Sequence, residues 1–139
     1  MSEKMPETLR EKIALNPFQG DFKRILCVCS GGILRSPTAA WVLGQEPYNA
    51  NTRAAGTKDY ALIPVDHDLL NWADEIVVME HHHQAAVIAL WNDASVKRSG
   101  FYPKDEMAPV KVLNIPDIYA YREPELIARI KRSYDKETK

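Results

Sequence analysis

A cysteine and an arginine stand six residues apart near the start of this chain, and they enclose two adjacent glycines, in Cys29-Ser30-Gly31-Gly32-Ile33-Leu34-Arg35. A thiolate is a strong nucleophile, and the planar guanidinium of arginine can hold two oxygens of a phosphate at once. The glycines let the backbone close around an anion without a side-chain clash, so that successive N–H groups point toward it. This combination predicts attack of sulfur on phosphorus.

The residues on either side predict the structure that must position this loop. The apolar run from Arg24 to Val28 predicts a strand, and Ser36-Pro37 is typical of the first turn of a helix. A loop between a strand and a helix N-terminus is a favourable place for an anion. We therefore expect Cys29 to be the nucleophile and Arg35 to bind the phosphate oxygens. The loop residues that should bind phosphate with it are Ser30, Gly31, Gly32, Ile33 and Leu34.

The loop and its flanks resemble the active-site signature of the low-molecular-weight protein tyrosine phosphatases, in which Val-Cys, five residues and Arg-Ser-Pro follow an apolar strand. Three later segments, Ala54–Thr57, Asp74–Glu80 and Asn114–Tyr119, resemble further parts of that family. The resemblance covers roughly residues 24–135. It implies a cysteine-dependent phosphatase, acting most of all on protein phosphotyrosine through a cysteinyl-phosphate intermediate, with no cofactor and no metal. It also implies that the Ser36 hydroxyl donates to the Cys29 sulfur, in addition to capping the helix.

A general acid is needed to protonate the leaving oxygen. The resemblance implies Asp117, which follows the last predicted strand and so should come off the same sheet edge as Cys29. The family's acid is normally followed by proline, whereas here Pro116 precedes it. Asp105 and Glu106 are the other candidates, and Asp117 could instead cap a turn or the final helix.

Two departures from the family pattern concern the loop itself. Gly32 replaces an asparagine that adopts a left-handed conformation in the family, and Ala54 replaces the serine that supports it. Glycine adopts that conformation unaided, so we expect a rebuilt loop that still works. Leu34 stands where the family often has a second cysteine, so a protective disulfide should be absent.

Aromatic and histidine residues suggest how substrates are selected. Tyr60 and Tyr119, with Tyr121, match places where the family has an aromatic wall that favours phosphotyrosine, although each could be ordinary half-buried packing. The run His81–His83 is expected to form a solvated helix entrance and to bind no metal, because consecutive residues do not converge on one ion. The tryptophans lie in amphipathic helices and are expected in the core; they are Trp41, Trp72 and Trp91.

Composition sets the outer bounds. The 139 residues, 45% hydrophobic and 27% charged, suit one globular domain at 21–139 behind a polar N-terminal extension at 1–20 without a secretory signal. A net charge of −1 provides no general positive field that would attract nucleic acid or a membrane surface. No apolar run approaches the ~20 residues of a membrane span. Cys27 and Cys29 are poorly placed to bridge each other, which suits the cytoplasm. The expected partner is a phosphorylated protein or a small aryl phosphate; the oligomeric state stays open.

Predicted strands and helices alternate along the chain. Strands are expected near 24–29, 51–55, 75–79 and 111–115, and helices near 36–45, 82–93 and 123–134, with a polar loop from 93 to 109. A further short helix that holds Leu69, Leu70 and Trp72 is expected after Pro64 and Asp66. This order predicts an α/β fold of three layers, a four-stranded parallel sheet with helices on both faces. Ligands of such sheets bind beyond the carboxyl ends of the strands, where the cysteine loop lies.

Three other functions stay open. A non-catalytic module would bind phosphate or a phosphoprotein without turnover. An arsenate reductase shares this loop but passes a disulfide along further cysteines, and Cys27 is the only other cysteine in the chain. A phosphoserine phosphatase, like the RNA polymerase tail phosphatase of this fold, differs in substrate alone.

Overall fold

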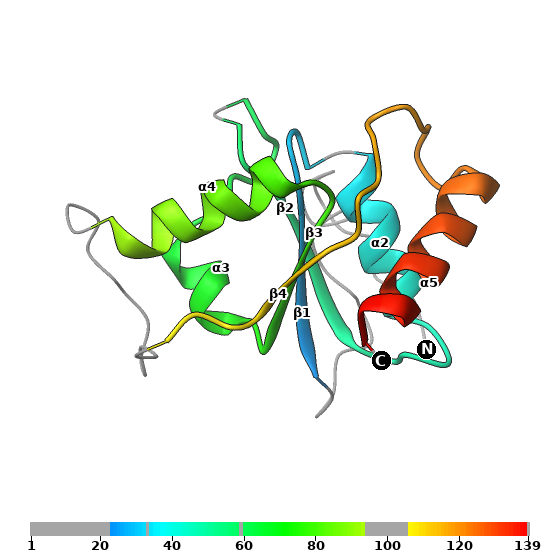
Figure 1. Cartoon of the computed structure of the whole chain (residues 1–139), viewed down its shortest axis with the longest axis horizontal. Coiled ribbons are helices and arrows are strands. Elements are labelled where there is room, and N and C mark those ends of the chain that lie inside the picture. Colours follow the sequence, from blue (N-terminus) through cyan, green and yellow to red (C-terminus); the bar gives the residue numbers. More distant parts are fainter. Residues whose placement is uncertain (1–22, 33, 59, 94–105, 139) are drawn as a thin grey trace, which may run out of the picture.

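A computed structural model of the chain describes residues 23–32, 34–58, 60–93 and 106–138. Strands and helices alternate through most of this part (Figure 1). The strands are β1 (Arg24–Cys29), β2 (Asn51–Gly56), β3 (Glu75–Val78) and β4 (Val110–Val112). The helices are α2 (Arg35–Leu43), α3 (His67–Trp72), α4 (His81–Asn92) and α5 (Pro124–Thr138).

The strands form one parallel sheet in the order β2-β1-β3-β4. β1 is central, and its residues from Ile25 to Cys29 are all buried, as an apolar strand covered on both faces must be. The chain leaves β1 toward β2 on one side and later returns to β3 on the other. This reversal between β1 and β3 leaves a crevice at the carboxyl ends of the strands, where sheets of this type bind ligands.

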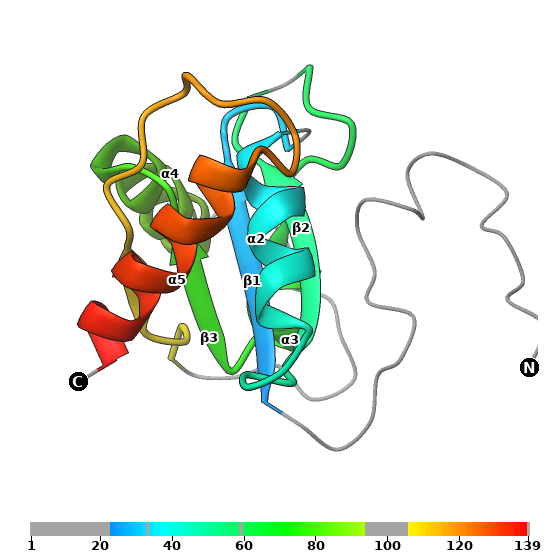
Figure 2. The ribbon, with the colours of Figure 1, turned by 90° about the vertical axis from the view of Figure 1, so that its right-hand side faces the viewer.

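Helices cover both faces of the sheet, with α2 and α5 on one face and α3 and α4 on the other (Figures 1 and 2). Alternate residues of β1 belong to different cores because successive side chains of a strand point to opposite faces. Ile25, Cys27 and Cys29 belong to the core under α2 and α5. Leu26 and Val28 belong to the core under α3 and α4. The predicted three-layer α/β fold is confirmed.

The predicted elements are confirmed, with some changed boundaries. The last strand ends at Val112 and not near 115, since Asn114 takes a left-handed conformation with φ of 59° and cannot continue a strand. The side chain of Asp66 accepts a hydrogen bond from the Leu69 N–H at 2.9 Å and caps α3. The predicted burial of Trp41 is wrong: its side chain is 38% exposed beside Arg122, whose guanidinium lies 4.3 Å from the centre of the indole ring.

None of the helices that the structure describes is long and apolar enough to cross a membrane. The polar extension predicted at 1–20 and most of the loop predicted from 93 to 109 lie outside the described residues.

Candidate active site

The loop after β1 folds back over the Cys29 sulfur. Cys29 is the last residue of β1 and is buried, and the Gly32 backbone N–H donates to its sulfur at 3.2 Å. The Ser36 hydroxyl lies 3.1 Å from the same sulfur and 3.2 Å from the Ala55 carbonyl oxygen. Ser36 has one proton to donate, so it bonds the carbonyl while Cys29 is a thiol and can turn to the sulfur once that is a thiolate. Two donors can therefore stabilise a thiolate here.

Ser36 does not cap α2, contrary to the expectation of a double role. The helix begins one residue earlier, at Arg35, and no side chain makes a capping hydrogen bond at its N-terminus. The Ser36 hydroxyl is instead buried and committed to the sulfur and to Ala55. This hydroxyl thus serves the cysteine rather than the helix end.

Gly32 has the left-handed conformation expected of it, with φ of 69°. A Cβ built on Gly32 would lie 2.9 Å from the Ala55 carbonyl carbon and from the Gly56 backbone nitrogen, closer than real contacts allow. The loop therefore packs directly against the backbone at the end of β2, and this close packing needs no supporting side chain from Ala54.

Replacing Gly32 with alanine should lower the free energy of unfolding by about 2 kcal/mol, because the methyl group meets immovable backbone and the conformation is strained. Urea unfolding measures the change. Gly31→Ala is the matched control, since its Cβ would only touch Tyr60 at 3.7 Å, and it should stay within about 0.5 kcal/mol of wild type. Equal losses in the two variants would contradict this account of the loop.

Arg35 lies beneath the loop, with a side chain only 2% exposed. Its Nη1 donates to the Glu80 carboxylate at the end of β3 and, at 2.8 Å, to the Ile115 carbonyl oxygen after β4. Its Nε lies 3.7 Å from a carboxylate oxygen of Asp117. Nη1 is thus anchored in the protein, while Nε, on the edge with which a guanidinium can grip an anion, faces the exposed carboxylate of Asp117.

Glu80 balances the buried charge of Arg35. The hydrogen bond from Arg35 lowers the pKa of the Glu80 carboxyl below its usual range, so it is ionised at neutral pH. A buried guanidinium without such a partner would be strongly destabilising. Because Glu80 lies two residues after the end of β3 and the arginine ends the loop after β1, this ion pair also joins the two sides of the crevice.

Asp117, the predicted general acid, contacts Arg35 from the segment after β4. Its side chain is 62% exposed, and its contact with Arg35 Nε places it beside the edge that would hold the phosphate. Glu106 precedes β4 and therefore lies toward the amino ends of the parallel strands, opposite the loop. Asp105 lies outside the described residues, as does Ile33 of the loop.

Comparison with known proteins gives matches of fold but none of sequence. No protein-family model matches the chain, and no curated protein sequence does. The tyrosine phosphatase Wzb from Escherichia coli K30, solved in complex with phosphate, matches 83% of this chain and 95% of its own, with a TM-score of 0.58 and 18% identity. A low-molecular-weight protein tyrosine phosphatase from Bacillus subtilis matches 84% of this chain and 99% of its own, with a TM-score of 0.52 and 20% identity. The fold is that of the low-molecular-weight protein tyrosine phosphatases.

A third structure of this fold is YwlE, described as an arginine phosphatase and solved as a cysteine-to-serine variant with a phosphorylated active-site serine. It matches 84% of this chain and 96% of its own, with a TM-score of 0.54 and 18% identity. The architecture implied by the resemblance of the loop is therefore confirmed across most of the chain.

The tyrosines expected to form a wall have different surroundings in this phosphatase fold. Tyr60 is 70% exposed, and its ring edge lies beside Gly31 of the loop. Tyr119 is partly buried against the core under α5, and its hydroxyl accepts a hydrogen bond from Arg129 at 3.4 Å. Tyr121 is 40% exposed and lies 5.0 Å from the Arg122 guanidinium, measured to the ring centre. Tyr60 is thus at the rim of the loop, whereas Tyr119 is also a packing residue.

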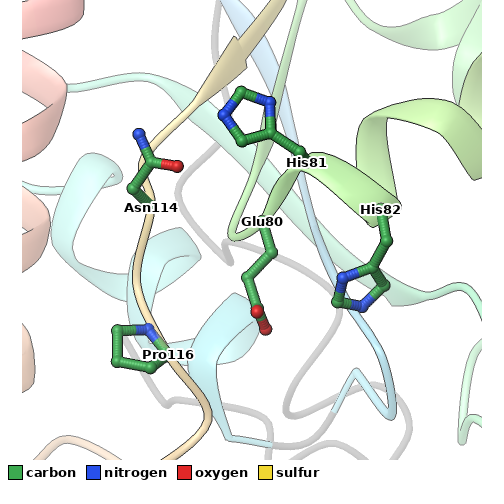
Figure 3. A pocket seen from close by; sticks show the side chains of 5 residues that line it. All are labelled: Glu80, His81, His82, Asn114 and Pro116. Atoms are coloured by element: carbon green, nitrogen blue, oxygen red, sulfur yellow. The ribbon is translucent and has the colours of Figure 1, made fainter.

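A pocket of about 350 Å³ lies beside Glu80, between the start of α4 and the segment after β4 (Figure 3). The residues that line it are Glu80, His81, His82, Asn114 and Pro116. The Glu80 carboxylate and the His82 ring lie on the same side of the α4 start, and His81 extends away from them (Figure 3). The pocket therefore adjoins the ion pair that anchors Arg35.

The expectation of a solvated helix entrance is wrong for His83. His81 and His82 are exposed, but His83 is completely buried. Donor atoms of Glu80, His82 and His83 come within 4.8 Å of one another, closer than consecutive histidines were expected to bring them. Both ring nitrogens of His83 are nevertheless engaged, with the Glu80 N–H and the Ser30 hydroxyl, and Glu80 is paired with Arg35. This arrangement favours a hydrogen-bonded network over a metal site.

Burial and the positive charges of His82 and Arg35 lower the pKa of His83 from 6.5 to about 4, with a smaller contribution from Lys58 and an opposing one from Glu80. Between pH 6.5 and 4 the His83 ring is therefore protonated in the unfolded chain and neutral in the folded protein. Stability should therefore fall as the pH falls from 6.5 to 4, by about 3 kcal/mol in total. Urea unfolding from pH 7 to 4 measures this, and His83→Gln should remove most of the slope. An unchanged slope would assign the acid sensitivity to other groups.

Sequence reasoning missed three contributors to the site, namely Glu80, the Ile115 carbonyl and His83. Glu80 had a sequence signal, since it directly follows the strand predicted near 75–79 and so lies at the edge where Cys29 ends its own strand. The Ile115 carbonyl has no such signal because any residue supplies a backbone oxygen.

Proposed function

We propose that this chain is a cysteine-dependent phosphatase that hydrolyses phosphomonoesters, with protein phosphotyrosine as its main substrate and a cysteinyl-phosphate as its intermediate. One observation carries the proposal. The Cys29 sulfur receives hydrogen bonds under a glycine loop, and the arginine that ends this loop is anchored by one edge while its other edge faces Asp117. Such a set of groups is arranged to bind a phosphate and attack it.

In the first step the Cys29 thiolate attacks phosphorus and the bond to the leaving oxygen breaks. Asp117 gives its proton to that oxygen, so the alcohol or phenol leaves neutral and a cysteinyl-phosphate remains. The loop N–H groups and the Nε–Nη2 edge of Arg35 stabilise the equatorial oxygens. In the second step the Asp117 carboxylate takes a proton from water, the hydroxide attacks phosphorus, and inorganic phosphate and the thiolate are released. Ser36 eases that departure by donating to the sulfur.

The substrate class follows from the rim of the loop. Cys29 and Arg35 are buried, so the phosphate must enter on a group long enough to reach them. The exposed ring of Tyr60 beside Gly31 gives an aryl group a face to stack on. This favours phosphotyrosine over phosphoserine. A reduced thiol is essential to the reaction, which suits a cytoplasmic enzyme.

Hydrolysis of para-nitrophenyl phosphate between pH 4 and 8, in the presence of EDTA, tests the proposal. The wild-type protein should turn over, and acid-quenched enzyme should carry phosphate on Cys29 by mass spectrometry. Phosphotyrosine, phosphoserine and phosphoarginine peptides then rank the substrates, the last because YwlE shares the fold. Absence of turnover, with inorganic phosphate still protecting Cys29 from alkylation, would make the chain a phosphate-binding module. Thiol oxidation that depends on arsenate would make it a reductase.

A further inference from the structure

His83 bridges two parts of the proposed site. Its Nδ1 accepts a hydrogen bond from the Glu80 backbone N–H at 3.0 Å, and its Nε2 lies 2.9 Å from the Ser30 hydroxyl. A backbone N–H can only donate, so Nδ1 carries no proton. The neutral ring therefore has its proton on Nε2 and donates it to the Ser30 oxygen. The two hydrogen bonds fix both the tautomer and the orientation of the ring.

The two residues that His83 holds both adjoin catalytic groups. Ser30 directly follows the nucleophile, and Glu80 anchors the guanidinium of Arg35. Contacts thus run from Cys29 through Ser30, His83 and Glu80 to Arg35, and the loop itself closes the ring from Arg35 back to Cys29. Within this ring of contacts His83 connects Ser30 to Glu80, and this pair of hydrogen bonds is called the brace below. Because the Ser30 oxygen accepts a hydrogen bond from His83, the hydroxyl proton of Ser30 remains available for another acceptor, such as a phosphate oxygen.

We infer that His83 is a positioning residue of the proposed phosphatase reaction, which holds Ser30 and Glu80 so that the loop and Arg35 face the same phosphate. The inference rests on the proposed function. Burial lowers the pKa of His83 to about 4, so the ring is neutral at the neutral and mildly acidic pH values of the assay and is protonated only near its acid limit. The brace is therefore intact wherever the enzyme is assayed above that pH. Groups that orient a reacting residue typically contribute about 10–100-fold in activity when they are removed.

Two substitutions separate the contacts of His83. Asparagine places an oxygen near the position of Nδ1, so His83→Asn keeps an acceptor for the Glu80 N–H and loses the contact with Ser30. Glutamine places an amide N–H near the position of Nε2, so His83→Gln keeps a donor for Ser30. We expect His83→Asn to lower kcat by about 10–100-fold with little change in KM, and His83→Gln to restore much of it. His81→Asn, on the exposed side of the same turn, is the matched control and should keep wild-type activity.

Ser30→Ala completes a double-mutant cycle. If His83 acts through Ser30, Ser30→Ala combined with His83→Asn should cost about as much as the more damaging single change. Additive effects, or wild-type kcat in a folded His83→Asn protein, would overturn the inference and leave His83 as part of the capping box of α4, in which its side chain accepts from the backbone N–H of Glu80 at the N-cap. Should His83→Asn fail to fold, His83→Ala replaces it in the same cycle, because Ser30 belongs to the phosphate-binding loop and Ser30→Ala alone would lower activity even if His83 were merely structural.

A second readout keeps this test separate from the proposed function. The concentration of inorganic phosphate that halves the rate of Cys29 alkylation reports the phosphate affinity without turnover. If the wild-type protein hydrolyses no phosphomonoester, the proposed function is wrong. The protection of Cys29 by inorganic phosphate still tests the role of His83 in that case. Weaker protection in His83→Asn than in His81→Asn supports the brace, and equal protection overturns it.

Discussion

Replacing Cys29 with serine should abolish phosphatase turnover, with a loss of about 10⁴-fold or more in kcat. A serine hydroxyl stays protonated at neutral pH and is a far weaker nucleophile than a thiolate. The rest of the site should remain, because the Gly32 N–H and the Ser36 hydroxyl can bond an oxygen in place of the sulfur. Hydrolysis of para-nitrophenyl phosphate measures the loss, and isothermal titration with inorganic phosphate shows that the anion site survives.

Cys27 provides the matched control. It lies two residues earlier on the same strand, faces the same core and is completely buried, and burial together with the charge of Glu75 raises the pKa of its thiol. Cys27→Ser should therefore cost some stability and leave kcat near the wild-type value. Turnover that survives Cys29→Ser would exclude the cysteinyl-phosphate reaction. Turnover lost equally in both variants would point to damage of the fold.

The fold was predictable because its strong signals are local. The apolar run of β1 and the Ser36-Pro37 start of α2 each depend on a few neighbouring residues, and the structure has an element at each place. The left-handed conformation of Gly32 was instead expected from the resemblance to the phosphatase family, and glycine adopts it without a supporting side chain. Trp41 could not be assigned, because a helix that packs on a sheet leaves part of its surface exposed and the helical period does not say which part.

The supporting contacts of the site could not be predicted, because they join distant parts of the chain. Arg35 meets Glu80 and the Ile115 carbonyl only after β1, β3 and β4 have paired in one register. The burial of His83 did have a signal in the sequence, because it lies four and eight residues before Val87 and Trp91, the other buried residues of α4. Its contact with Ser30, which lies 53 residues earlier, had none. Residue types showed which chemistry is available, whereas the sheet decides which side chains take part.

Asp117→Asn should lower kcat by about 10²–10⁴-fold, because the leaving oxygen then departs without a proton. KM should stay the same or fall, since the substitution removes a negative charge 3.7 Å from Arg35 Nε, next to the expected place of the phosphate. The loss should be larger for phosphotyrosine than for para-nitrophenyl phosphate, whose leaving group is more stable as an anion. Steady-state kinetics with both substrates measure this difference, which a merely structural role would not produce.

Glu106→Gln is the control for this substitution, because it removes the same charge from an exposed carboxylate that precedes β4 at the other end of the sheet. It should leave both kcat and KM near the wild-type values. An unchanged kcat in Asp117→Asn would transfer the role of the acid to another group, and Asp105→Asn would be the next variant to assay. The comparison is made on kcat/KM, which reports the first step and not the hydrolysis of the cysteinyl-phosphate. An equal loss of kcat/KM for both substrates in Asp117→Asn would mean that Asp117 orients Arg35 and does not deliver the proton to the leaving group.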